Sequence, residues 1–405
     1  MKRETELFLG ALKAAMKNEY VDWNTEISRE EWAAVLRLAE VHRVLPMVFQ
    51  AVYTCPAAAG ADRELMRLYR RKTMHSVALQ TRKTTEFRPI LEALREAGVE
   101  PLVVKGIVCR QLYPNPDYRF SSDEDVWIPP EQMEACHRVL SRYGMATPDP
   151  ASADYELPYT SKSGALYLEV HKSLFPPESD AYGDLNRFFA GARSRQILAG
   201  GVPTMDYTDH LLYLICHAFK HFLHSGFGIR QVCDMIVFAN AYGREIDWIR
   251  ILDACRQIRA EQFTAGIFRI GWKYLNFSVE DSRYPLQWQA IYVDETPLLE
   301  DILQSGVYGS ADQNRVHSSR ITLDAFSAQK RGRRGSGGVL KSVFPPAKSL
   351  ESRYPYLKEK PILLPVAWTD RLLRFQKGPA SGSDAVRIGS QRVELLKRYG
   401  VLDKN

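Results

Sequence analysis

The chain has 405 residues, of which 45% are hydrophobic and 25% charged, so it can build two or three domains with ordinary cores. Its formal net charge of +6 is mild and favours anionic ligands such as nucleotides without requiring nucleic acid. The six cysteines are widely spaced and form no CxxC motif, so the sequence predicts neither a zinc ribbon nor a disulfide framework. Without a long apolar run, we expect a soluble cytoplasmic protein that contacts no membrane.

The first predicted region is helical and ends near residue 97. Segment 30–52 carries apolar residues at helical spacing, and segment 88–98 does so as well, with Gly98 placed to end the helix. The next segment, 101–106 (PLVVKG), is a β-branched run too short for a helix and predicts a strand. A short helix over 106–113 follows, before the NPD sequence breaks it.

Two further strands are predicted after this helix. Segment 123–128 (DEDVWI) is the first, and segment 164–175 (GALYLEVHKSLF) alternates its residues as a strand does. A helix over 130–144 separates the two and ends at a glycine. The succession of strand, helix, strand, helix and strand predicts an α+β core with a mixed sheet, flanked by N-terminal and C-terminal helical regions.

The C-terminal half begins with two strong helical patterns, over 210–243 and 247–275. A loop-rich stretch covers roughly 278–350, and a last helix is predicted over 390–400. Within the loop-rich stretch, segment 330–338 (KRGRRGSGG) is basic and rich in glycine, which is typical either of a solvated loop or of a site for RNA or a phosphorylated substrate.

These patterns divide the chain into four expected regions. An N-terminal helical region covers 1–84, and an α/β core follows over 85–205. A helical subdomain covers 206–280, and a loop-rich C-terminal region covers 281–405.

A pair of acids at the start of the second strand is the strongest chemical signal. Residues i and i+2 of a strand point to one face, so Asp123 and Asp125 are expected to project together. Two carboxylates at such a short separation repel each other unless a cation lies between them. Their oxygens are hard ligands, which suit Mg²⁺ or Mn²⁺. On the third predicted strand Glu169 could supply a third carboxylate, with His171 on the same face. The alternative is a solvated turn followed by an edge strand.

Segment 103–128 resembles the opening motif of the nucleotidyltransferase fold shared with DNA polymerase beta. More narrowly, it resembles a bacterial family of uncharacterised nucleotidyltransferases, whose pattern is LKG, then a helix ending in LYP, then R-x-x-S-D-x-D. The matching residues here are 104–106, 112–114, Arg119, Ser122, Asp123 and Asp125. Segments 168–175, 214–222, 229–238 and 354–374 resemble later parts of that family. A departure is Ile107, where the wider superfamily has serine or glycine after the glycine.

The resemblance implies a role for each matching residue. Asp123, Asp125 and Glu169 would hold the metal ions, and Glu169 or His171 would act on the acceptor as catalytic groups. Gly106 would let the backbone approach the triphosphate, with amides of the following helix facing phosphate oxygens. The residues expected to bind nucleotide are Lys105, Gly106, Arg119, Ser122, His217, His221, Arg230 and Asp234.

The histidines of the 210–243 helix allow two interpretations. His217, His221 and His224 share one helical face, so they line the cleft or are satisfied in the core. Without an HExxH motif they do not predict a zinc protease. Arg230 and Asp234 are four residues apart and could form a pair within their helix.

The implied function is metal-dependent transfer of a nucleoside monophosphate from an NTP, with ATP the expected donor, to an acceptor hydroxyl, releasing pyrophosphate. Mg²⁺ or Mn²⁺ would be the cofactor, and the sequence does not name the acceptor. One alternative is an accessory protein that binds nucleotide or peptide and is catalytically silent. Another, less favoured, is an RNA-binding module that uses segment 330–338.

Overall fold

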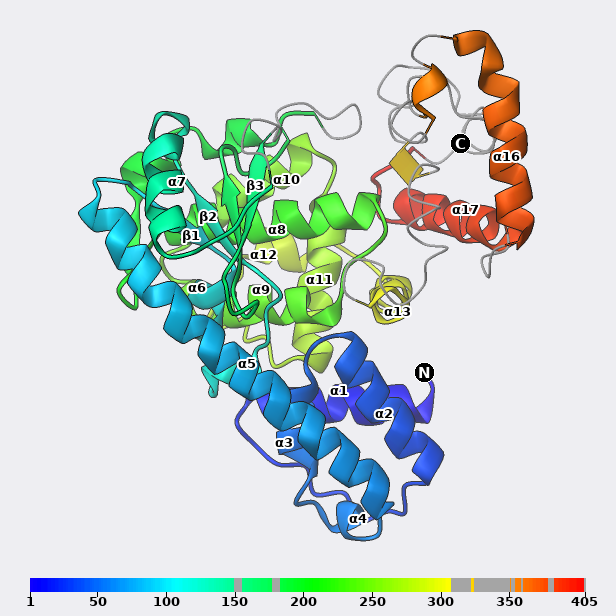
Figure 1. Ribbon diagram of the computed structural model, residues 1–405. Coiled ribbons are helices and arrows are strands. Elements are labelled where there is room, and N and C mark those ends of the chain that lie inside the picture. The colour runs from blue at the N-terminus through cyan, green and yellow to red at the C-terminus, as the bar shows by residue number, and fades with distance from the viewer. Residues whose placement is uncertain are drawn as a thin grey trace.

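The computed structural model describes residues 1–148, 155–176, 183–306, 322–323, 350, 354–357, 360–377 and 382–403. The expected α+β class is confirmed, because a small mixed sheet is surrounded by helices. Figure 1 shows the N-terminal helices at one end of the molecule and the sheet with its covering helices beyond them. The basic segment 330–338 lies outside the described residues.

The N-terminal region is helical, as predicted. Its helices are α1 (Arg3–Met16), α2 (Arg29–Val41), α3 (Leu45–Val52), α4 (Pro56–Ala59) and α5 (Arg63–Glu96). Helix α2 begins at a capping box in which Ser28 and Glu31 satisfy each other's backbone N–H groups. Helix α5 is 34 residues long and runs from the N-terminal helices to the sheet (Figure 1). The expected four-region division stays a prediction, and α5 passes unbroken across residue 84.

The central sheet has the strand order β1-β2-β4-β3. The strands are β1 (Leu102–Val104), β2 (Glu124–Trp127), β4 (Tyr167–His171) and β3 (Glu156–Thr160). Strand β2 pairs antiparallel with β1 and parallel with β4, and β3 pairs antiparallel with β4 at the edge. Between β1 and β2 lie the short helix α6 (Gly106–Arg110) and a 3₁₀ turn at Pro116–Tyr118, and α7 (Met133–Arg142) follows β2.

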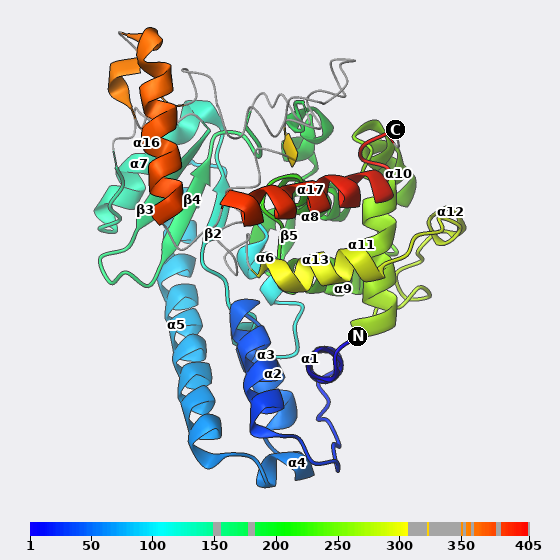
Figure 2. The same cartoon turned by 90° about the vertical axis from the view of Figure 1, so that its right-hand side faces the viewer.

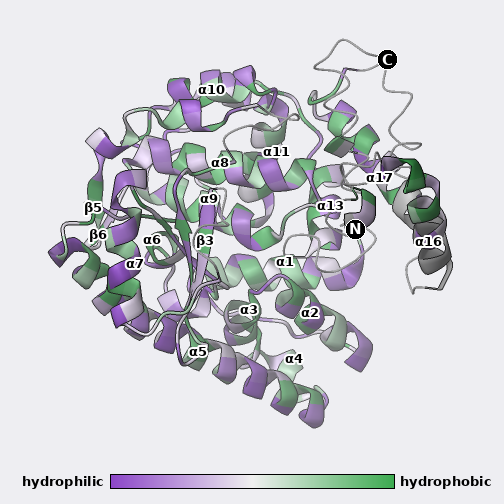
Figure 3. Cartoon of the chain, turned by 45° about the horizontal axis from the view of Figure 1, so that its top comes forward, coloured by the Kyte–Doolittle hydropathy of each residue, from purple (hydrophilic) through white to green (hydrophobic). Residues whose placement is uncertain are grey.

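The C-terminal half adds a hairpin and the helices that complete the core. These elements are β5 (Ile197–Ala199), β6 (Val202–Thr204), α8 (Tyr207–Leu223), α9 (Ile229–Tyr242), α10 (Trp248–Gln257), α11 (Glu261–Tyr274), α12 (Leu286–Gln289), α13 (Thr296–Ser305), α16 (Leu364–Lys377) and α17 (Gly382–Arg398). Helix α8 is buried along almost its whole length and packs against α9 and α10. In Figure 2 α17 lies in front of α8, and Arg392 of α17 donates to the Phe222 carbonyl of α8. Peripheral helices such as α2 and α5 alternate polar and apolar bands in Figure 3, typical of amphipathic helices.

Three strands lie where none was predicted. Strand β3 contains Pro158, which cannot donate to a neighbouring strand and is therefore tolerated at the sheet edge. Strands β5 and β6 have three residues each and are joined by Gly200 and Gly201, whose φ angles are +55° and +81°. Two glycines with positive φ form the kind of tight turn that joins antiparallel strands.

All six cysteines are described, and each is free and buried. Within the described parts of the chain, no helix is long and apolar enough to span a membrane.

A buried ion pair supports the face of the sheet that points away from the two predicted acids. Glu124 and Arg110 are 0% and 1% exposed, and Arg110 Nη1 lies 2.8 Å from Glu124 Oε1. Glu124 Oε2 also accepts the Ile107 N–H at 2.8 Å. A side chain at Gly106 is excluded, because an added Cβ would lie 2.0 Å from Glu124 Oε2. Glu124 therefore fixes where α6 begins relative to β2.

Replacing Arg110 by methionine should lower the free energy of unfolding by about 3–5 kcal/mol, because Glu124 then stays buried without its cation. Urea unfolding followed by circular dichroism measures the change. The control is Arg138→Met, which breaks an exposed pair with Glu134 and should cost less than about 1 kcal/mol. Similar small losses for both variants would contradict this role for Arg110.

Candidate active site

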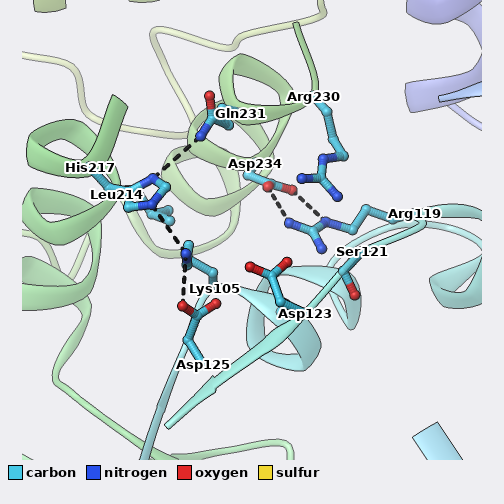
Figure 4. Close-up of a pocket in the computed structure, with 11 residues that line it drawn as sticks. Lys105, Arg119, Ser121, Asp123, Asp125, Leu214, His217, Arg230, Gln231 and Asp234 are labelled. Carbon is cyan, nitrogen blue, oxygen red and sulfur yellow. Dashed lines mark hydrogen bonds and ion pairs between the residues drawn. The ribbon is translucent and has the colours of Figure 1, made fainter. Parts of the chain in front are cut away.

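One pocket gathers most of the residues predicted from the sequence. It encloses about 390 Å³ of empty space, part of it open to solvent. Its walls come from the β1–α6 turn, the segment that leads into β2, and helices α8 and α9 (Figure 4). The lining residues are Lys105, Gly106, Arg119, Ser121, Asp123, Asp125, Leu214, His217, Arg230, Gln231 and Asp234.

Asp125 is buried in the middle of the sheet, 1% exposed, where strand pairing sets its neighbours. Its register partners are Val104 on β1 and Glu169 on β4. Asp125 Oδ1 accepts from His171 Nε2 at 2.9 Å and lies 3.0 Å from Lys105 Nζ. Burial alone would raise the pKa of Asp125, but Lys105 and His171 outweigh burial and hold the pKa well below its ordinary value.

Asp123 precedes β2 by one residue and is partly exposed. Its carboxylate points into the pocket beside Lys105 and toward Arg119 in Figure 4. Among the described residues it makes no hydrogen bond and no ion pair. The two predicted acids therefore differ: Asp125 is fully compensated, whereas Asp123 offers its oxygens to the pocket.

Glu169 and His171 lie beside Asp125 on β4, but they do not line the pocket. One donor atom from each of Asp125, Glu169 and His171 lies within 4.8 Å of the other two, close enough to hold a metal ion. Burial, followed by the charges of Asp125 and Asp123, raises the pKa of Glu169 to about 8. The two carboxylates offer the oxygen ligands that hard divalent cations prefer, whereas the imidazole is a ligand for softer metals, so the cluster by itself does not name the ion.

The opposite wall of the pocket is cationic. Arg119 donates from Nε and Nη2 to the two oxygens of Asp234, at 3.0 and 2.5 Å. The Tyr113 hydroxyl also donates to Asp234, at 2.8 Å. Arg230 donates to the carbonyl oxygen of Phe120. The pair expected between Arg230 and Asp234 within their helix is therefore wrong, because Asp234 binds the guanidinium of a residue 115 positions away.

Both arginines keep an N–H group for a ligand. Arg119 Nη1 and Arg230 Nε are buried and lack a hydrogen-bond partner among the described residues. Both side chains line the pocket, as Asp123 does, so each unused donor belongs to a residue of the pocket wall. A buried donor without a partner is costly, so these groups indicate an anionic ligand.

His217 lies between Lys105 and Gln231, and its protonation state decides which of their groups donate and which accept hydrogen bonds. Lys105 Nζ lies 3.2 Å from His217 Nε2, and the Gln231 amide lies 3.3 Å from His217 Nδ1. Burial, together with Lys105, holds the pKa of His217 well below its ordinary value, so the ring is neutral. Lysine can only donate, so Nε2 accepts and Nδ1 carries the proton. Gln231 must then turn its carbonyl oxygen to Nδ1.

The β1–α6 turn has an unusual backbone. Lys105 has φ +54° and Gly106 has φ +30°. The Lys105 N–H donates to His210 Nε2 at 3.1 Å. His210 Nδ1 therefore donates to Thr204 Oγ1 at 3.0 Å, and Thr204 donates to the Val103 carbonyl at 2.6 Å. This chain of hydrogen bonds ties the turn to α8 and β6.

Other predicted residues lie at the margin of the pocket or outside it. Ser122 does not line the pocket, and its Oγ accepts from Arg43 Nη1 at 2.6 Å. His221 does not line it either and packs its ring against His217 at 4.6 Å between centroids. The expectation that the first amides of α6 face a phosphate is wrong for Ile107, which donates to Glu124 as described above.

Several important residues escaped the sequence interpretation. Lys83 on α5 is 1% exposed and donates to the carbonyls of Ser121 and Ser122, at 2.5 and 2.7 Å. Burial lowers the pKa of Lys83 to about 8. The sequence did offer a clue to Lys83. Gln80, Lys83 and Phe87 are three and four residues apart, so they lie on one face of the helix, and Phe87 is an apolar residue expected to be buried. His210 carried a signal as well, because it lies seven residues before His217, near the same helix face, whereas Gln231 carried none.

Comparison with known proteins agrees with this geometry. A family model described as uncharacterised nucleotidyltransferase matches residues 28–275, which is more than half of the chain. Searches among curated proteins and among solved structures gave no match. The matched range holds the whole mixed sheet, every residue that lines the pocket, and the Asp125, Glu169 and His171 cluster. The chain therefore belongs to the family of uncharacterised nucleotidyltransferases.

Proposed function

We propose that this chain is a metal-dependent enzyme that transfers a nucleoside monophosphate from an NTP, with ATP the expected donor, to an acceptor hydroxyl. Family membership supports the general reaction. One observation supports the mechanism most strongly: a single pocket is lined both by the carboxylates Asp123 and Asp125 and by two arginines that each keep an unused guanidinium donor. The metal–triphosphate unit of a nucleotide presents the complementary pair of charges.

In this reaction the acceptor oxygen forms a bond to the α-phosphorus, and the bond from that phosphorus to the bridging oxygen breaks. Pyrophosphate leaves with the electron pair, and the acceptor hydroxyl loses its proton. A divalent cation, when bound, would neutralise charge that develops on the phosphate oxygens. Arg119 and Arg230 would hold the triphosphate by their unused donors, so catalysis would come mainly from positioning and fixed charge.

We assign separate roles to the residues around the acids. Asp123, Asp125 and Glu169 would hold the metal, and Glu169 could instead take the acceptor proton when it is ionised. His171 is a positioning residue, because its Nε2 is committed to Asp125 and the ring is buried. Asp234 would likewise position Arg119.

The catalytically silent alternative makes a different prediction about turnover. A binding protein would take up nucleotide without consuming it, whereas the proposed enzyme releases pyrophosphate only when metal and acceptor are both present. Incubation with each labelled NTP, Mg²⁺ or Mn²⁺, and cell extract tests this difference and shows which molecule becomes labelled.

Asp123→Asn and Asp125→Asn should each lower metal-dependent pyrophosphate release by about 10²-fold or more, the scale on which single preorganised electrostatic groups act. Their stabilities in EDTA should differ. Asp123→Asn should keep or raise the melting temperature because Asp123 has no partner to lose, whereas Asp125→Asn should lower it by removing an ion pair. Asp253→Asn, at an acid whose side chain is 61% exposed, is the control. Near wild-type turnover in either site variant would contradict the metal assignment.

The contribution of Glu169 to the stability of the metal-free protein should fall as pH rises from about 4.5 to 8, opposite to that of the buried histidines, whose lowered pKa values favour the folded state as pH rises. Its pKa is raised from 4.5 to about 8 in the folded state, so the folded state holds the extra proton across this range. The stabilisation is complete below the unfolded pKa and is lost as pH rises through the folded pKa. Relative to the wild type, Glu169→Gln should therefore gain stability as pH rises from about 4.5 to 8, measured by urea unfolding of both proteins in EDTA. An unchanged profile would argue against the raised pKa.

Arg230→Met should weaken binding of Mg·ATP about tenfold or more with little loss of stability, because its partner is a neutral carbonyl. Arg119→Met should instead destabilise the fold, because it leaves Asp234 buried without its cation. Calorimetric titration and thermal unfolding separate the two outcomes. Equal nucleotide affinity in Arg230→Met and the wild type would remove Arg230 from the binding site.

A further inference from the structure

Lys105 occupies the place beside Asp125 where the proposed function requires a metal cation. We propose that Lys105 is an exchangeable counter-ion, which neutralises Asp125 before metal binds and leaves that carboxylate when a divalent cation arrives. The inference rests on the proposed function and adds a competition between a side chain and the metal. It makes Lys105 a residue that links metal binding to phosphate binding.

The first support is the crowding at one oxygen atom. Lys105 Nζ and His171 Nε2 both contact Asp125 Oδ1, at 3.0 and 2.9 Å. A Mg²⁺ ion on the same oxygen would lie about 2.1 Å away, with its waters around it. At such a short separation an ammonium group and a divalent cation repel each other strongly, particularly because the carboxylate between them is buried. The metal and Lys105 therefore compete for Asp125.

The second support is the backbone of Lys105. Its φ angle of +54° is unfavourable for any residue with a side chain, at a cost of about 1–3 kcal/mol. Glycine would adopt this conformation without strain, so the lysine side chain must offset the cost. The hydrogen bond from the Lys105 N–H to His210 holds the strained turn in place. In this turn the ammonium lies in the pocket, between Asp125 and His217 (Figure 4).

The third support is that a displaced ammonium has a destination. Lys105 lines the same pocket as Arg119 and Arg230, whose unused donors indicate an anion. The four-carbon stem of lysine allows its ammonium to move while the backbone stays fixed. A phosphate in the pocket would therefore draw Lys105 away from Asp125, and a metal on Asp125 would release Lys105 toward the phosphate. By thermodynamic reciprocity, each ligand would then favour the other.

Binding of Mn²⁺ alone, without nucleotide, tests the competition. Free Mn²⁺ is measured by electron paramagnetic resonance for the wild type, Lys105→Met and Lys220→Met. Lys220 is a matched control, because it is a nearby partly exposed lysine that lies over the Tyr155 ring instead of contacting Asp125 directly. Lys105→Met should bind Mn²⁺ about tenfold more tightly than the wild type, and Lys220→Met within about twofold. Equal effects of the two variants would overturn the inference.

Asp125→Asn in the same experiment separates this inference from the proposed function. If wild-type Mn²⁺ binding does not depend on Asp125, the metal assignment and the counter-ion role both fail. If binding depends on Asp125 but Lys105→Met has no specific effect, the metal site stands and only the counter-ion role is rejected.

A second readout uses the wild-type protein and so does not depend on whether a variant folds. Lysine acetylation followed by mass spectrometry reports how accessible each ammonium is. Lys105 should react slowly in EDTA, where Asp125 holds it, and several-fold faster with saturating Mg²⁺. Lys83, held by two backbone carbonyls, should react equally slowly in both conditions. An unchanged rate at Lys105 would show that the metal does not displace it.

Discussion

The site is organised around one buried carboxylate, that of Asp125. Removing a carboxylate from water costs several kcal/mol unless cations and hydrogen bonds compensate for it. Antiparallel pairing with β1 brings Lys105 to this carboxylate, and parallel pairing with β4 brings His171. Helix α8 then holds the strained turn through His210. Sheet topology, the β1–α6 turn and α8 thus converge on the same oxygen atom, and the rest of the pocket is arranged around it.

The sequence allowed much of the central fold to be predicted. The order of β1, α6, β2, α7 and β4 followed from short β-branched runs alternating with helical spacing. Edge strand β3 escaped because Pro158 interrupts its pattern, and the edge position that tolerates proline is not visible in one dimension. The β5–β6 hairpin could have been recognised from Gly200 and Gly201, a pair typical of tight turns between strands.

Less of the site could be predicted, because its chemistry depends on contacts between distant parts of the chain. Asp123 and Asp125 are two residues apart and both line the pocket, but only the fold distinguishes the paired acid from the unpaired one. Arg119 was expected to bind nucleotide from its motif, yet its salt bridge to Asp234 joins residues 115 positions apart. Local sequence does not reveal partners so far apart in the chain. For this reason the four-residue spacing of Arg230 and Asp234 suggested an ion pair within the helix that the structure does not contain.

The burial of all six thiols has a practical consequence for labelling this protein in studies of conformational change. Burial raises the pKa of Cys109, Cys216 and Cys233, so little reactive thiolate forms at these positions near neutral pH. A single cysteine introduced at an exposed position would therefore react selectively with a maleimide. Fluorophores or spin labels can then be attached without first removing the native cysteines, whose replacement would disturb a close-packed interior.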